Sequence, residues 1–246
     1  KPSPKGDTTR LISGPADWIS PDGSPTDPHV SSGAKVILYD TDHICGMCYG
    51  QTSGPNDLSF GHNFVWKSFI YGYNPIYMDG YDGAGYGVGG NGYNFNDPRW
   101  VTIRNNMGYA LDYSRRMNFA AMKPRPNLSN VAWVLANTSA TGAEYLAYMP
   151  GGGSFTLDLR SAQTQLAVEW LNPATGAKLN GGTVSGGAVR SFSAPFAGDA
   201  VLYVRDANGV VVTPQPTATH TPLATATSTA TVGSAATATQ AATHTP

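Results

Sequence analysis

The second half of this sequence consists of short apolar runs that alternate with polar residues and are separated by glycine-rich turns. Alternation with a period of two places every second side chain on one face of a strand. Trp133 and Trp170 lie in two of these runs, and alternation predicts that at least one is in the core. Short strands at this spacing predict an antiparallel β-sandwich over residues 118–212. The runs are V-A-W-V-L-A (131–136), E-Y-L-A-Y-M (144–149), S-F-T-L-D-L (154–159), L-A-V-E-W-L (166–171), V-R-S-F-S-A (189–194) and A-V-L-Y-V (200–204). The turn signals between them include T-G, P-G-G-G, N-P-A-T-G, N-G-G and A-G-D.

The first half of the chain has a different pattern. K-V-I-L-Y-D (35–40) is a continuous apolar run, as expected of a strand buried on both faces, and P-I-Y-M-D (75–79) is a second one. A helix is predicted between them over about residues 57–73, with Phe64, Ile70 and Tyr73 on its apolar face. The order is therefore strand, helix, strand, and a second helix follows.

The second helix has a clear start and end in the sequence. Asp97 is a good N-cap, Pro98 suits the first turn, and Arg115 and Arg116 suit the last turn. Trp100, Ile103, Met107 and Leu111 follow at helical spacing. Two strand–helix units cannot close a sheet alone, so residues 1–117 are expected to be the last, incomplete part of a larger α/β domain.

The remaining residues, 213–246, contain no charged and no aromatic residue and are rich in Thr and Pro. Such a composition cannot bury a core, which predicts a disordered linker. His220 and His244, both in H-T-P, are interpreted as part of this linker.

Composition excludes some partners and locations. The formal net charge is −1 and only 13% of residues are charged, so there is no electrostatic case for a nucleic acid partner. The sequence contains no run of about 18 apolar residues, so no membrane span is predicted. The chain opens with K-P-S-P-K-G-D, without a signal peptide, and we expect it to be the C-terminal fragment of a longer protein.

Several stretches resemble one known family. V-I-L-Y-D-T-D-H (36–43) and F-V-W-K-S-F-I-Y-G-Y-N-P-I-Y-M-D (64–79) are similar to the end of the (β/α)8 TIM barrel of secreted bacterial, apiosidase-like glycoside hydrolases. Members often carry a C-terminal β-sandwich labelled "putative collagen-binding domain of a collagenase". That part of the resemblance rests on A-E-Y-L-A-Y-M-P-G-G-G (143–153), V-E-W-L-N-P-A-T-G (168–176) and F-S-A-P-F-A-G-D-A-V-L-Y-V (192–204).

The resemblance covers roughly residues 33–206 and implies an architecture and a reaction. Strands 35–41 and 75–79 become the seventh and eighth strands of the barrel, the first six are missing, and residues 1–34 lead into strand seven. The implied reaction is hydrolysis of a glycosidic bond in a polysaccharide or its side chains, outside the cell or at its surface, with no cofactor. The fragment alone is expected to be inactive.

Asp40 and Asp42 end the first of these strands, where barrel enzymes carry their active sites. Being two residues apart, they point the same way while the chain stays extended. Glycoside hydrolysis needs two opposed carboxylates, so we predict Asp42, with Asp40 beside it, as one half of a catalytic pair. Related barrels usually have a Glu at this strand end. The alternative is that both carboxylates cap the loop by binding backbone N–H groups.

Residues near the two strand ends are candidates for substrate binding. His43 and Asp79 could hydrogen-bond sugar hydroxyls, and Tyr86 and Tyr93 could stack on sugar rings. Alternatively, Asp79 and Asp82 belong to a simple D-G-Y-D-G turn, and the tyrosines only fix their loop to the surface.

Cys45 and Cys48 form a single C-x-x-C. The preferred interpretation is a small-loop disulfide, or two free thiols, that stiffens the active-site loop. A structural zinc site needs about four ligands, and only His43 and Asp42 are at hand, so no metal is predicted. A redox motif needs a helix directly after the first cysteine, where Gly46 and Gly50 indicate a loop.

A formal G-x-G-x-x-G runs from Gly85 to Gly90, but it opens no helix, so nucleotide binding is rejected.

Two alternatives to an enzymatic function remain. The sandwich could be a non-catalytic module that attaches the parent protein to collagen-like protein or a cell-surface polysaccharide, which a row of exposed aromatic residues would favour. It could also serve only to cover the barrel, which a large apolar interface would favour.

Overall fold

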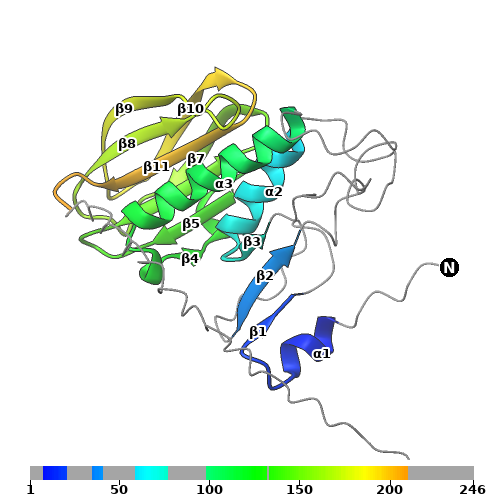
Figure 1. Cartoon of the computed structure of the whole chain (residues 1–246). Helices are drawn as coiled ribbons and strands as arrows, with labels where there is room; N and C mark the ends of the chain where they lie inside the picture. Colours follow the sequence, from blue (N-terminus) through cyan, green and yellow to red (C-terminus); the bar gives the residue numbers. More distant parts are fainter. Residues whose placement is uncertain (1–7, 21–34, 41–58, 77–97, 132, 210–246) are drawn as a thin grey trace, which may run out of the picture. The chain divides into compact units, whose positions relative to one another are not determined.

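The computed structural model describes residues 8–20, 35–40, 59–76, 98–131 and 133–209 (Figure 1). The predicted linker lies outside these residues. The first part contains α1 (Thr8–Ser13), β1 (Trp18–Ile19), β2 (Val36–Asp40), α2 (Ser59–Ile70), β3 (Asn74–Ile76), α3 (Pro98–Arg116) and the 3-10 turn η3 (Phe119–Ala121). No helix of the described residues is long and apolar enough to cross a bilayer.

β1, β2 and β3 form a parallel sheet in that order. Trp18 pairs with Val36 at one side of β2, and Asp40 pairs with Ile76 at the other. The expectation that residues 1–34 only connect into the sheet is therefore wrong for β1. A two-residue strand carries no periodicity, so only its pairing with β2 reveals it.

The helix α2 ends as its sequence allows. Gly72 has a φ of 77°, and the N–H groups of Gly72 and Tyr73 donate to the carbonyls of Phe69 and Ser68, at 3.0 and 2.9 Å. This is a Schellman motif, in which glycine accepts the left-handed conformation without strain. The chain can then reverse directly into β3.

The second part is a β-sandwich, as predicted. A six-stranded antiparallel sheet has the order β4-β5-β6-β11-β8-β9, and β7 pairs with β10 in a second, two-stranded sheet. The elements are β4 (Lys123–Pro124), the 3-10 turn η4 (Pro126–Leu128), β5 (Trp133–Asn137), β6 (Glu144–Met149), β7 (Gly152–Asp158), β8 (Gln165–Leu171), β9 (Lys178–Ser185), β10 (Val189–Ala197) and β11 (Ala200–Asp206).

The six runs expected from the sequence are all strands, but β9 was missed. The N-G-G at residues 180–182 predicted a turn, whereas it lies inside β9 beside a register shift between Val168 and Glu169 of β8. Almost every residue of β9 is exposed, so the strand has no alternating apolar pattern. Its place at the sheet edge explains this exposure.

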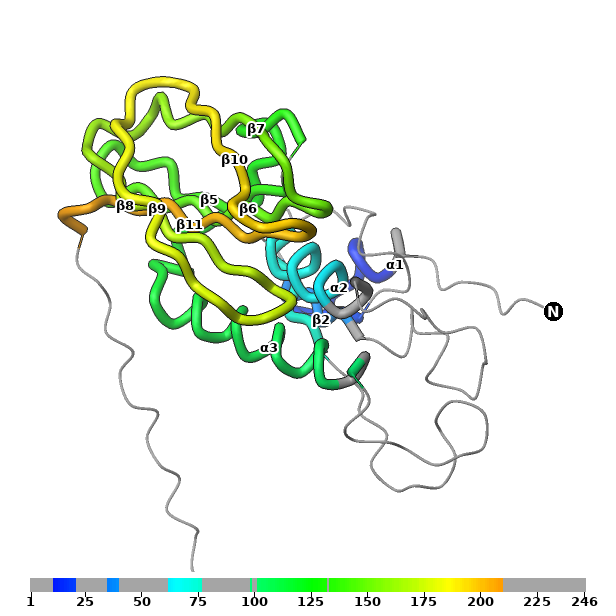
Figure 2. The backbone as a smooth tube through the Cα atoms, turned by 90° about the horizontal axis from the view of Figure 1, so that it is seen from above, coloured from blue at the N-terminus to red at the C-terminus, as the bar shows by residue number. Residues whose placement is uncertain are grey.

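Each face of the six-stranded sheet has its own partner (Figure 2). One face packs against β7 and β10 and contains Trp170, 6% exposed, next to Phe155 and Phe192. This confirms that at least one of the two tryptophans is in the core. The other face, with Leu146, Tyr148 and Tyr203, packs against α2 and α3 in a separate core cluster.

The helix-side cluster also includes β1, β2 and residues on both sides of position 117. Phe64, Ile70 and Tyr73, predicted to be apolar contacts of the first helix, are all buried. For α3 the predicted stripe is only partly right, because Ile103 is buried but Leu111 is 49% exposed. The buried face instead contains Ala110, Tyr113 and Met117.

Trp66 lies at the centre of this cluster. Its side chain is fully buried, with ring centroids 5.9 Å from Tyr113 of α3 and 6.5 Å from Tyr148 of β6. Its indole N–H donates to Asn106 Oδ1 over 2.8 Å, and the Asn106 amide donates to the Pro173 carbonyl over 3.0 Å. One side chain thus connects both helices and the sandwich.

We expect Trp66→Ala to lower the free energy of unfolding by about 3–5 kcal/mol, because it leaves a large cavity and an unpaired amide oxygen. Chemical denaturation followed by circular dichroism measures this. Leu111→Ala, at an exposed site of α3, should change it by less than about 0.5 kcal/mol. Equal effects of the two substitutions would contradict the central position of Trp66.

Candidate functional site

The predicted catalytic site belongs to the edge of the parallel sheet where β2 and β3 both end. Asp40 is the last residue of β2, and its Cα partner on β3 is Ile76, the last residue of that strand. Asp42 is two positions beyond the last residue of β2, and Asp79 is three positions beyond the last residue of β3. The two strands that precede the predicted site residues therefore end side by side at the same edge of the sheet.

The side chains of this predicted site are not described by the structure. For Asp40 only the backbone is described. The other predicted catalytic, substrate-binding and disulfide residues lie outside the described residues, namely Asp42, His43, Cys45, Cys48, Asp79, Tyr86 and Tyr93. Their roles remain predictions.

Aromatic side chains pack against β2 on the face of the sheet that is covered by α2. Tyr39 is fully buried, and its ring stacks on Phe64 of α2 at 5.7 Å and lies 5.7 Å from Tyr73. The Asn74 amide donates to the Ile37 carbonyl over 3.1 Å, across the pair of strands. The positions of β2 and β3 are thus fixed by α2.

The opposite face of the parallel sheet is apolar and open within the described residues. Trp18 is 61%, Val36 51% and Ile76 36% exposed, and strand pairing places all three on the face away from Ile37 and Tyr39. Parallel sheets are normally covered on both faces.

A buried polar cluster holds the first turns of α2 against the sandwich. Asp199, in the A-G-D turn before β11, lies 3.3 Å from His62 Nδ1. The Tyr148 hydroxyl donates to the same carboxylate over 2.5 Å, and the Gly151 N–H over 2.7 Å. Because the helix of a βαβ unit runs back against its strands, His62 is near the end of the sheet where β2 and β3 stop.

The acidity of Asp199 follows from this cluster. Burial opposes ionisation of its carboxyl, but the hydrogen bonds from His62, the Gly151 N–H and Tyr148 outweigh it and lower its pKa below 3.8. Burial is also the main reason why the pKa of the Tyr148 hydroxyl is raised, and the Asp199 bond and charge add to it. Asp199 is therefore an ionised acceptor at neutral pH.

A second polar network fixes the end of α3. Glu169 of β8 accepts hydrogen bonds from Tyr113 Oη at 2.7 Å and from the Arg116 guanidinium at 2.9 Å. Glu144 of β6 accepts from Tyr203 Oη at 2.7 Å and from the Asn118 N–H at 2.8 Å. These networks join residues far apart in the chain, so no local sequence pattern indicates them.

Near its middle, at Tyr109, α3 approaches the N-P-A-T-G turn closely. Gly176 has a φ of 75°, and a Cβ at this position would overlap the Tyr109 hydroxyl. The glycine is therefore required by both the turn and the helix contact.

The described residues contain no group of three His, Cys, Asp or Glu side chains placed to hold a metal ion. What the described part supplies is a scaffold: it aligns two strand ends and holds the helix between them. The predicted catalytic and substrate-binding residues follow those strand ends in the sequence.

Residues 127–205 match the family described as "Putative collagen-binding domain of a collagenase". This segment contains most of the β-sandwich, in agreement with the resemblance noted in the sequence. No curated protein matches the chain.

Solved structures of glycoside hydrolases resemble the chain in fold. One, described as a glycoside hydrolase, has a TM-score of 0.55 at 15% identity over 72% of this chain and 44% of its own. A family 5 glycoside hydrolase from Bacteroides vulgatus ATCC 8482 has a TM-score of 0.55 at 16% identity, over 75% of this chain and 44% of its own. The chain thus spans less than half the length of these two structures.

The structural similarity extends beyond the sandwich. Residues 127–205 are too few to supply 72% of the chain, so part of the preceding α/β segment must also match. At these identities the similarity concerns the fold alone.

We expect Asp199→Asn to destabilise the chain by about 1–3 kcal/mol at pH 7, because it removes a buried charged acceptor. The depressed pKa of Asp199 contributes stability that is present above 3.8 and is lost as the pH falls further. Denaturation of both forms over a pH series should therefore show their difference shrinking below pH 3.8.

Asp158→Asn is the matched control. This partly exposed carboxylate pairs with the neighbouring Arg160, whose own side chain is exposed, so its loss should have an effect of less than about 1 kcal/mol. A difference between wild type and Asp199→Asn that stays constant below pH 3.8 would contradict the role of the ionised carboxylate.

Proposed function

We propose that this chain is the C-terminal part of a glycoside hydrolase that acts on a polysaccharide or its side chains outside the cell. One observation carries the proposal: β2, α2 and β3 form a parallel βαβ unit whose strand ends lead directly into Asp42 and Asp79. The fold similarity to glycoside hydrolases over most of the chain supports it.

The open face of the parallel sheet supports the barrel. Trp18, Val36 and Ile76 present an apolar surface that, in a (β/α)8 barrel, is the interior filled by side chains from the other strands. If β2 and β3 are the seventh and eighth strands, β1 is the sixth. The remaining strands, and a carboxylate opposite Asp42, then come from a part of the parent protein that precedes these residues.

In the proposed mechanism, Asp42 acts as one of two carboxylates flanking the scissile bond, with Asp40 beside it. The partner on a preceding strand is either an acid–base residue about 5–5.5 Å away, for retention, or one about 6.5–9.5 Å away, for inversion. His43 and Asp79 bind sugar hydroxyls, Tyr86 and Tyr93 stack on the sugar, and a Cys45–Cys48 disulfide stiffens the loop. No cofactor is needed.

The sandwich has a structural role in this proposal. Its helix-side face forms one core with α2 and α3, the apolar interface expected of a domain that covers the barrel. The large apolar residues exposed in the described part of residues 118–212 are Phe119, Val131, Leu179 and Val189. Phe119 is the one aromatic residue among these four, so they do not form the row of aromatics that would favour a binding platform.

Attachment to collagen-like protein or a cell-surface polymer is the second candidate function. The description of the family that matches residues 127–205 favours it. In either case residues 213–246 would serve as a linker in a secreted or surface-tethered protein.

We expect Asp42→Asn in the full-length parent to reduce polysaccharide hydrolysis by about 10²–10⁴-fold, the usual contribution of a catalytic carboxyl group. Release of reducing sugar from a panel of plant and microbial polysaccharides measures this. Asp17→Asn, at an exposed site before β1, is the matched control and should leave activity unchanged.

Residues 1–246 alone should release no sugar, because the opposing carboxylate is absent from them. Hydrolysis by this chain alone, or full activity of the Asp42→Asn parent, would refute the proposed mechanism.

A further inference from the structure

Two adjoining cavities lie on the helix-side face of the six-stranded sheet, beside the C-terminal half of α3. One, of about 300 Å³, lies over β8, β9 and β11, and the other, of about 510 Å³, lies between the end of α3, η3 and the strands β6 and β11. Glu169, Tyr203 and Arg205 line both cavities. The two therefore form one groove, which we call the α3 groove.

The α3 groove exists because α3 covers only part of the sheet. Lys178 and Asn180 of β9, exposed residues paired with Leu171 and Glu169 of β8, extend the helix-side face past the helix. This end of the face is polar, whereas the part under the helices is apolar. A polar, concave surface next to a packed interface is suited to a polar ligand.

Arg205 lines both cavities of the α3 groove, and part of its hydrogen-bonding capacity is unused within the described residues. Within the described residues its guanidinium donates one hydrogen bond, to the Asp206 carbonyl at 3.3 Å. A guanidinium has five N–H donors, so several remain for a ligand.

The acceptors of the groove are held in fixed positions. Glu144 is 9% exposed and accepts two hydrogen bonds from the protein. A carboxylate can accept about four hydrogen bonds, so Glu144 retains capacity toward the cavity. Asp206, 5% exposed, is held by the N–H groups of Gly142 and Asn208. The pKa of Asp206 is lowered by the backbone N–H groups of Gly142 and Asn208, which keeps it ionised.

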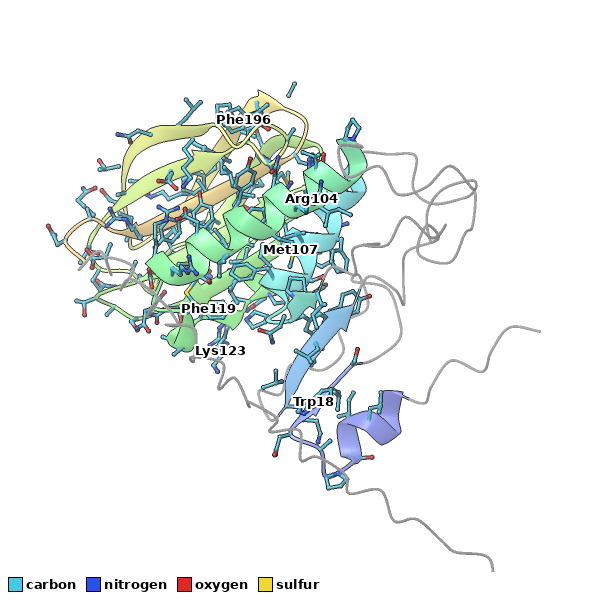
Figure 3. The ribbon with its side chains drawn as sticks, in the orientation of Figure 1. Trp18, Arg104, Met107, Phe119, Lys123 and Phe196 are labelled. Carbon is cyan, nitrogen blue, oxygen red and sulfur yellow. The ribbon has the colours of Figure 1, made fainter. Side chains whose placement is uncertain are left out.

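An aromatic side chain, Phe119, lines the α3 groove at one end. Phe119 of η3 is 38% exposed, and its other side stacks on Phe69 at 5.3 Å with an interplanar angle of 5° (Figure 3). A ring held in this way offers a rigid apolar face to a ligand.

The charges of the α3 groove balance. Its lining contains three acidic residues, Glu144, Glu169 and Asp206, and three basic residues, Arg116, Lys178 and Arg205. Such a surface gives no net attraction to an anion or a cation. The groove offers hydrogen-bond donors, hydrogen-bond acceptors and one aromatic ring. A sugar matches all three features, because its hydroxyl groups donate and accept hydrogen bonds and its ring has an apolar face.

We propose that the α3 groove binds a neutral oligosaccharide chain, apart from any catalytic site. The groove would hold a single glycan strand on the sandwich, at the end of α3. This binding needs no catalytic activity, so it can fail or succeed independently of the proposed hydrolysis.

Isothermal titration of residues 1–246 with cellohexaose, xylohexaose and mannohexaose tests the proposal, with oligogalacturonate as the charged comparison. We expect at least one neutral hexaose to bind. Arg205→Ala and Phe119→Ala should each weaken that binding by about tenfold or more, through a lost charged hydrogen bond and a lost stacking face.

Arg160→Ala is the matched control, because Arg160 is an exposed arginine whose ion pair, with Asp158, lies outside the groove. It should bind as the wild type does, and melting curves confirm that all variants are folded. The proposal is overturned if no neutral hexaose binds, if only oligogalacturonate binds, or if the two groove variants bind with unchanged affinity.

Discussion

The packing of α2 and α3 against one face of the six-stranded sheet determines where the other described elements lie. Trp66 contacts Tyr113 and Tyr148 and binds Asn106, so one buried indole joins two helices and the sandwich. The same helix holds β2 through the stacking of Phe64 on Tyr39. The sandwich therefore positions, through α2, the strand whose end leads to the proposed catalytic residues.

Polar contacts fix the positions of α2 and α3 on the sheet. Buried hydrophobic surface alone would allow a helix to slide, whereas the Asp199 and Glu169 networks each require one arrangement of donors and acceptors. The two networks lie at different helices, one at the start of α2 and one at the end of α3. Together the two networks fix both helices to the sandwich, which in turn supports the parallel strands.

The sequence predicts those elements that contain an apolar run between turn residues. Such runs identify β5, β6, β7, β8, β10 and β11, and the spacing of Phe64 and Ile70 identifies the buried face of α2. This prediction misses β1, which is too short for a period, and β9, whose exposed edge has no apolar pattern. The adjacent ends of β2 and β3 could be predicted, but the Asp199–His62 pair could not, because it depends on tertiary packing of distant residues.

Native-state hydrogen exchange of residues 1–246 tests the central claim, that helices and sandwich share one cooperative core. The account predicts that the central amides of α2 and α3 open with the same free energy as those of β6 and β11, and with the same dependence on denaturant. Opening of α2 and α3 at a free energy several kcal/mol below that of the sheet would contradict it.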